Sequence, residues 1–150
     1  MKSLFNKDDV SSFIERMNNL KTNAPPLWGK MNAAQMLAHC CVPLESAVGK
    51  EKLKRAFIGY LFGAIALKKM VGNDKPFDKN LPTDKRFVMK ANHNFAEEKT
   101  RLISLIHKFS EAGPEGITRH PHPFFGKMTP GEWDIMMSKH LDHHFRQFGV

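Results

Sequence analysis

The chain contains very little cysteine, and the little it has cannot form a cross-linked framework. Its two cysteines, Cys40 and Cys41, are adjacent in the sequence. Neighbouring cysteines rarely bond to each other, because the geometry of a disulfide is demanding. A small disulfide-stabilised secreted domain is therefore excluded, and we predict a reducing compartment and a cytoplasmic location.

Long hydrophobic runs are also missing. The longest, residues 56–67, contains twelve residues, whereas a helix that spans a bilayer needs roughly 20. The first residues of the chain lack the apolar stretch and the small-residue cleavage site of a signal peptide. We therefore expect no membrane span and no secretory leader.

Acidic residues are scarce relative to basic ones, which gives a formal net charge of +8. The excess lies in residues 50–101, which hold 13 Lys/Arg against 6 Asp/Glu. These lysines do not alternate with stacking aromatic residues, and no nucleic-acid-binding motif accompanies them. The interpretation we favour over nucleic-acid binding is a solvated basic surface, or one that attracts small anionic substrates.

What the sequence does contain is helical periodicity. A length of 150 residues with 41% hydrophobic content predicts one globular domain over residues 1–150. Apolar residues recur at helical spacing in residues 6–20, 32–47, 94–109 and 129–150. Each stretch starts near a good helix-capping residue: Asn6 or Asp8, Asn32, Asn94 and Thr129. Pro43 is expected to bend the second helix locally. The predicted fold class is all-α, with four main helices.

The segment between the second and third main helices is long. Residues 50–72 predict one or two further helices, and residues 73–93 an irregular crossover. The expected apolar face of the helical part consists of Phe57, Tyr60, Leu61, Ala64 and Leu67. Gly59 and Gly63 form a small-xxx-small pair, which we interpret as a site of close packing or a subunit interface. A helix lying in a membrane interface is a less favoured alternative, suggested by the flanking lysines.

Two of the predicted helices are preceded by similar sequences. Residues 26–31 read Pro-Leu-Trp-Gly-Lys-Met, and residues 123–128 read Pro-Phe-Phe-Gly-Lys-Met, 97 positions later. A capping-box pattern follows each one directly. One interpretation is an internal pseudo-symmetry that brings both helices to one site. The other is that this pattern is simply an effective way to start a buried helix.

The last helix places two histidines on its apolar face. Trp133, Met137, His140 and His144 fall within about 60° of one another on a helical wheel. Imidazoles at positions i and i+4 can bind one metal ion. Burying two imidazoles without partners is costly, so the spacing fits either a metal site or a pair of neutral, hydrogen-bonded histidines.

Two histidines make a weak metal site, so a third ligand is needed. His39 is the leading candidate, because it is the other histidine that lies at a suitable position in a core-forming helix. His93, His120 and His122 lie in predicted connections and could reach inward. A fourth ligand from His120 or His122 would indicate a closed, structural metal site.

These residues carry a family resemblance. Ala-Gln-Met-Leu-Ala-His39-Cys, followed later by Trp133 and by Lys-His140-Leu-Asp-His-His144-Phe-Arg-Gln, resembles the DinB/YfiT-like superfamily, and within it a branch of uncharacterised bacterial proteins. The resemblance covers nearly the whole chain in element order and is most specific at the histidine-rich end. It implies a four-helix bundle with a long, partly helical connection between helices 2 and 3. It also implies a zinc or nickel ion bound by His39, His140 and His144.

The resemblance implies a chemistry as well. Characterised members include thiol S-transferases that use bacillithiol or mycothiol-type cofactors, and a mycothiol-dependent isomerase. Three histidine ligands leave an open metal position, and a thiol bound there would be deprotonated at neutral pH. We therefore expect a metal-dependent S-transferase-like enzyme that acts on a small molecule with a low-molecular-weight thiol. The basic segment, residues 50–92, departs from the family pattern and leaves the substrate and the oligomer geometry open.

Two alternatives remain open at this stage. A metal-dependent hydrolase is disfavoured, because no Asp or Glu stands one turn from a ligand on the apolar face. A non-catalytic bundle would use the metal, or the histidine cluster alone, to hold its helices together. The basic segment would then bind an acidic partner or a second copy of the chain in a homodimer.

Five residues are candidates for lining a pocket beside the metal: Trp28, Cys40, Phe125, Trp133 and Met137. Bulky aromatic walls around an open metal position favour a small-molecule site. For each residue taken singly, ordinary core packing is the better-supported interpretation. Cys40 in particular falls on the apolar face of its helix.

Overall fold

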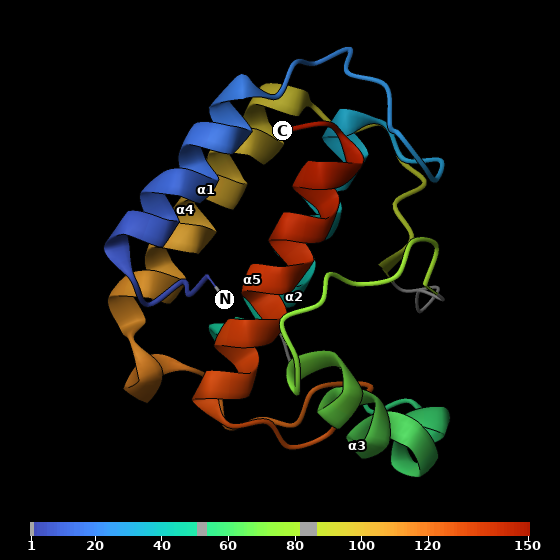
Figure 1. Ribbon diagram of the computed structural model, residues 1–150, viewed down its shortest axis with the longest axis vertical. Coiled ribbons are helices and arrows are strands. Elements are labelled where there is room, and N and C mark those ends of the chain that lie inside the picture. The colour runs from blue at the N-terminus through green and yellow to red at the C-terminus, as the bar shows by residue number, and fades with distance from the viewer. Residues whose placement is uncertain (1, 51–53, 82–86) are drawn as a thin grey trace.

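The computed structural model describes residues 2–50, 54–81 and 87–150, and over these residues it forms five α-helices (Figure 1). They are α1 (Lys7–Asn19), α2 (Ala33–Ala47), α3 (Phe57–Val71), α4 (Phe95–Ala112) and α5 (Pro130–Gln147), with a short 3-10 helix, η2 (Pro114–Gly116). No strand forms within the described ranges, where His122 and Gly126 make an isolated antiparallel bridge. The predicted all-α class is confirmed.

Local sequence determines where the helices start. Capping boxes begin α2, at Asn32, and α5, at Thr129. The side-chain oxygens of Asn6 and Asn94 cap α1 and α4. These caps satisfy backbone N–H groups that have no partner inside the helix, and each of the four predicted helix starts is confirmed.

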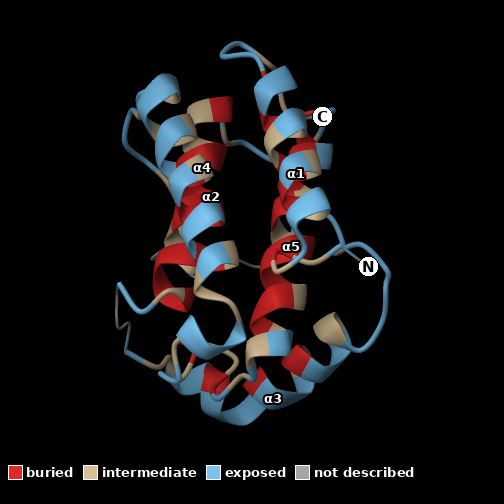
Figure 2. Cartoon of the chain, turned by 90° about the vertical axis from the view of Figure 1, so that its left-hand side faces the viewer, coloured by how far each residue is buried: buried red, intermediate tan, exposed pale blue. Residues whose placement is uncertain are grey.

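Helices α1, α2, α4 and α5 lie alongside one another and enclose the core (Figures 1 and 2). Helix α2 packs most closely on α4, while α5 contacts both α1 and α2. The largest fully buried side chains are Trp133, Phe13, Phe109 and Phe145. Full burial of a large apolar side chain contributes roughly 1.5–3 kcal/mol, so these side chains stabilise the packing of α1, α4 and α5 around the core.

Helix α3 lies across one end of the molecule (Figure 1). The residues predicted to form its buried face are exposed, with the exception of Leu67. Its buried residues are Gly59, Gly63 and Leu67, whereas Phe57 is 81% exposed. A Cβ atom on Gly63 would lie only 2.1 Å from the carbonyl oxygen of Phe124. The glycine pair therefore allows close packing within the chain, and the predicted apolar face points to solvent except at Leu67.

The region around α3 tests the other predictions for this segment. Residues 54–56 are not helical and residues 51–53 lie outside the described residues, so the predicted helix over residues 50–72 is confirmed from Phe57. Residues 73–81 form neither helix nor strand, as expected for an irregular crossover. None of the described helices has the length and apolarity that a bilayer crossing requires.

The two similar sequences before α2 and α5 adopt the same backbone conformation at their glycines. Gly29 has φ of 79° and Gly126 has φ of 82°, values that residues with a side chain rarely adopt. The turn that precedes α2 contacts the end of α5, where the Leu27 N–H donates to the carbonyl of Gln147 at 2.8 Å. A Cβ atom on Gly29 would lie 2.7 Å from Nε2 of Gln147. The turn and the end of α5 are therefore fitted to each other.

Candidate metal centre

The three predicted histidine ligands meet between α2 and α5. His39 projects from α2, and His140 and His144 project from successive turns of α5. One ligand atom from each histidine lies within 4.8 Å of those of the other two. His39 and His144 are buried and His140 is partly exposed. This group could hold a metal ion.

A hydrogen bond behind the ring of His39 determines which nitrogen faces the cluster. Nδ1 of His39 lies 2.9 Å from the carbonyl oxygen of Phe87. A carbonyl can only accept, so neutral His39 carries its proton on Nδ1 and presents an unprotonated Nε2. Metal-binding histidines are usually oriented in this way by a partner on the far side of the ring.

Gln147 plays the same part for His144. Nδ1 of His144 lies 2.8 Å from Oε1 of Gln147, and Nε2 of Gln147 donates to the carbonyl of Trp28 at 2.6 Å. Because that carbonyl can only accept, the amide oxygen must face His144, and Nδ1 of His144 must donate. Nε2 of His144 is left unprotonated. Gln147 is itself buried, which protects this link from water.

His140 faces His39 directly. Their Nε2 atoms are 3.1 Å apart. Since Nε2 of His39 is unprotonated, the proton in this hydrogen bond belongs to His140 in the metal-free chain. For His140 to bind a metal through Nε2, that proton would have to leave or move to Nδ1.

Burial keeps all three rings neutral. It lowers the pKa of His39, with the Phe87 carbonyl acting in the opposite direction, and it lowers the pKa of His144 to about 3. The pKa of His140 lies well below its usual value, first through burial and then through the neighbouring histidines. His140 keeps some exposed surface, but its ring is enclosed closely enough to be desolvated. Neutral imidazole is the form that binds a metal ion.

The histidines considered as alternative ligands do not join the cluster. His122 is buried, but its Nδ1 accepts from the backbone N–H groups of Phe124 and Phe125 at 3.1 Å each. His93 bonds a carboxylate of α4 at 3.0 Å, and His120 is exposed. Among residues 2–50, 54–81 and 87–150, the group able to share one ion is the predicted set of three.

The predicted pocket residues occupy two kinds of position. Cys40, Trp133 and Met137 belong to the buried core, whereas Trp28 and Phe125 are partly buried. Nε1 of Trp133 is a buried donor for which the described residues supply no hydrogen-bond partner. The proposed role of these five residues in lining a pocket stays a prediction.

Cys40 behaves as a core residue. It is fully buried, and its Sγ lies 3.8 Å from Sδ of Met36, one turn away. Burial raises the pKa of the Cys40 thiol well above its usual value, with a smaller contribution from Cys41. A thiol that stays protonated is neither a nucleophile nor a metal ligand.

Gln147 and Phe87 were missed by the sequence reasoning for different reasons. Gln147 stands three residues after His144, and residues at i and i+3 of a helix are neighbours. That spacing was a usable signal. The contribution of Phe87 is a backbone carbonyl in an irregular segment, and no property of the Phe87 side chain points to it.

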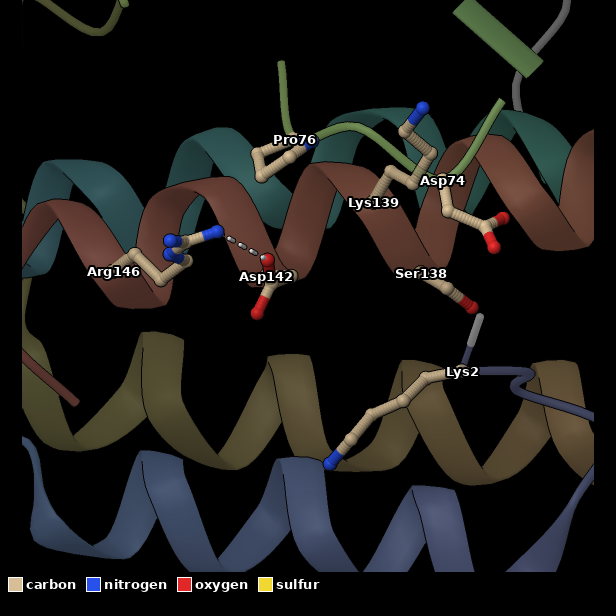
Figure 3. A pocket seen from close by; sticks show the side chains of 7 residues that line it. All are labelled: Lys2, Asp74, Pro76, Ser138, Lys139, Asp142 and Arg146. Carbon is tan, nitrogen blue, oxygen red and sulfur yellow. Dashed lines mark ion pairs between the residues drawn. The ribbon is translucent and has the colours of Figure 1, made fainter. Parts of the chain in front are cut away.

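Figure 3 shows a hollow beside α5 whose lining includes none of the three histidines. It has a volume of about 230 Å³ and is lined by Lys2, Asp74, Pro76, Ser138, Lys139, Asp142 and Arg146. Lys139 donates to the carbonyls of Met70 and Asn73, and Asp142 pairs with Arg16 and Arg146. These internal partners leave little reason to assign the hollow a ligand.

A family model described as "Protein of unknown function (DUF1569)" matches residues 2–149. The chain belongs to this family. The match includes α2 and α5, the two helices that carry the three predicted ligands of this DUF1569 member. Comparisons with curated proteins and with solved structures gave no match. Membership of the DinB/YfiT-like superfamily stays a prediction.

Proposed function

We propose that this DUF1569 protein is a divalent-metal-dependent enzyme whose ion is bound by His39, His140 and His144. The observation that carries the proposal is the fixing of His39 and His144 by acceptors behind their rings. Both histidines are thereby set with an unprotonated Nε2, and the ligand atoms of the group converge within 4.8 Å. Zinc and nickel both accept imidazole ligands. The resemblance of the sequence to the DinB/YfiT-like superfamily, which implies the same three ligands in a four-helix bundle, supports this assignment.

The chemistry we propose is thiol-dependent transfer to a small molecule. With three histidine ligands, zinc or nickel would leave a position at which a thiol or water ligand has a lowered pKa. The chain itself orients His39 through Phe87 and His144 through Gln147, and its packing desolvates all three rings. Among the described residues, no carboxylate belongs to the histidine group. The described part of the chain thus supplies no carboxylate in that group as a base for hydrolysis, and we favour a low-molecular-weight thiol as co-substrate.

A non-catalytic metal site is the second candidate. The observation that favours it is the position of Cys40, Trp133 and Met137 in the core instead of around an open cavity. A metal in that setting would tie α2 to α5 and add to the stability of the folded chain.

Metal content is the first test. Untagged protein would be incubated with zinc or nickel, desalted and analysed by elemental mass spectrometry, beside His140→Ala and a control, His107→Ala. His107 is exposed on α4, so we expect about one ion per chain in wild type and the control. We expect loss of the ion in His140→Ala. Failure of wild type to take up metal, or equal uptake by His140→Ala, would contradict the proposal.

The two candidate functions differ in whether the ion keeps an open position. Cobalt-loaded protein would be titrated with a small thiol while its absorption spectrum is recorded. An enzyme with an open position should develop a thiolate-to-cobalt charge-transfer band. An unchanged spectrum in protein that does contain cobalt would favour the structural role.

A further inference from the structure

A group of exposed apolar side chains on α3 has no role in the metal centre. Six large residues on this helix are between 55% and 81% exposed: Phe57, Ile58, Tyr60, Leu61, Phe62 and Ile65. Single exposed apolar residues are ordinary, but a contiguous group marks an interaction surface. In Figure 2, α3 is largely pale blue, at the end of the molecule. We call these six residues the α3 apolar face.

The α3 apolar face is fixed outward by contacts on the opposite side of the helix. Gly59 and Gly63 pack against the backbone of Phe124, where a Cβ atom on either glycine would come within 2.4 Å or less. The N–H of Ala56 donates to the Pro123 carbonyl at 2.8 Å. If α3 rotated about its axis to bury its large side chains, it would lose these contacts with Pro123 and Phe124.

Positive charge stands at both ends of the α3 apolar face. Lys54 and Arg55 precede the helix, Lys68 and Lys69 lie in its last turn, and residues 54–73 contain no acid. Lys54, Lys68 and Lys69 are exposed. A helix of this length extends roughly 22 Å at 1.5 Å per residue. The apolar strip is thus bracketed by cations along one line.

These charges distinguish between two binding partners for the α3 apolar face, a second copy of the chain and an anionic bilayer. A second copy of the chain would bring the same cations to the interface, and either orientation of two α3 helices places like charges together, which opposes association. An anionic bilayer supplies the complement. Apolar side chains can enter the boundary of the acyl region while lysines reach the phosphates, and each basic residue near such a surface adds to binding.

We propose that α3 docks this protein on an anionic lipid surface, lying along the surface with its apolar face inserted. Tyr60 fits this setting, because tyrosine favours the membrane–water interface. The proposal does not depend on the metal centre, since none of the three histidines is on α3.

The test is cosedimentation of the full chain with vesicles, at low ionic strength. Vesicles of phosphatidylglycerol mixed with phosphatidylcholine would be compared with pure phosphatidylcholine. The loss variant is Leu61→Asp with Ile65→Asp, and the matched control is Leu27→Asp, because Leu27 is 68% exposed and lies outside α3. We expect wild type and the control to bind the anionic vesicles, and the loss variant to bind about tenfold more weakly.

A charge variant, Lys68→Glu with Lys69→Glu, should also bind about tenfold more weakly, and added salt should weaken wild type. Unchanged circular dichroism would show that the variants fold, which is expected for exposed positions. The proposal is overturned if wild type stays in solution with anionic vesicles, or if Leu27→Asp loses as much binding as the loss variant. A dimer that Leu61→Asp with Ile65→Asp dissociates, in protein that binds no vesicles, would instead assign this face to self-association.

Discussion

Gln147 is the residue on which the orientation of His144 depends. Its amide is held at one end by the Trp28 carbonyl, so its oxygen can only face the imidazole. The side chain belongs to the same helix as the ligand, yet its own anchor comes from the turn before α2. A single polar residue thus joins the histidine cluster to a turn 119 positions away in the chain.

Gln147→Leu should weaken metal binding without removing a ligand. The substitution keeps a side chain of similar volume but deletes the acceptor behind Nδ1 of His144. Loss of such a partner typically costs 10–100-fold in metal affinity. Affinity would be measured by competition with a chromophoric chelator. Arg146→Gln is the control, because Arg146 is exposed and makes a long 3.6 Å ion pair with Asp142. Equal affinity in Gln147→Leu and wild type would show that the link does not tune the site.

The proton positions on the three rings are a second prediction at this scale. In metal-free protein at neutral pH, we expect Nδ1–H on His39 and His144, and Nε2–H on His140, because of their hydrogen-bond partners. Nitrogen-15 NMR of labelled imidazoles distinguishes the two tautomers. Addition of zinc should remove the proton from Nε2 of His140. A spectrum with Nε2–H on His39 or His144 would contradict the assigned network.

At the scale of helices, close backbone contact determines how α3 is attached. Its buried side contains Gly59 and Gly63, which lie directly on the backbone of Phe124 and Phe125. Such contacts depend on the absence of a side chain, so they are sensitive to a single methyl group. The packing of α3 can therefore be tested without altering the core.

Gly63→Ala should destabilise the protein. Its added Cβ would lie 2.1 Å from the Phe124 carbonyl oxygen, and backbone cannot easily yield. Overpacking of this kind costs typically 1–3 kcal/mol, or about 2–4 °C in Tm per kcal/mol for a chain of this size. Gly131→Ala in α5 is the matched control, because nothing lies within 4 Å of the added atom. Thermal unfolding followed by circular dichroism gives both values, and an unchanged Tm in Gly63→Ala would refute the packing account.

The contrast between α3 and the other helices shows what could be predicted from the sequence. Helix starts at Asn32 and Thr129 were predictable, since a cap is a local contact between residues three apart. The orientation of α3 was not, because periodicity assumes that apolar side chains face inward. In α3 the glycine side faces inward, because it packs against the backbone of Phe124 and Phe125. Distant partners decide such cases, and the sequence gives no measure of them.

The candidate site also combines residues that could be predicted from the sequence with contacts that could not. His140 and His144 followed from helical spacing, and His39 from its place on a core-forming helix. Their convergence depends on how α2 packs against α5, which the family resemblance implied and periodicity could not. The carbonyl of Phe87 lay beyond either kind of reasoning, because any residue could supply it.

At the scale of the whole molecule, the buried histidines make stability depend on pH. In the unfolded chain a histidine has a pKa of about 6.5, whereas burial lowers the pKa of all three in the folded chain. Below about pH 6.5 the unfolded chain therefore binds protons that the folded chain does not. The free energy of unfolding must then fall as the pH falls, and this loss continues until the folded-state pKa is reached.

Metal-free protein should accordingly become less stable between pH 7 and pH 5. His144, with its pKa lowered to about 3, alone contributes a slope of about 1.4 kcal/mol per pH unit below its unfolded pKa. Urea unfolding in the presence of a chelator would give the slope. His144→Ala should reduce it, whereas Leu27→Ala should not, because Leu27 is not ionisable and is 68% exposed. A pH-independent wild type would mean that the rings are not desolvated.

The distances along the chain have a consequence for synthesis. His39 and His140 are 101 positions apart, and the link that orients His144 spans 119. A growing chain on the ribosome therefore offers His39 alone until α5 has been made. By that time α1, α2 and α4 have already been translated and can pack on one another. The proposed ion could therefore be bound by all three histidines only after most of the helices have been made.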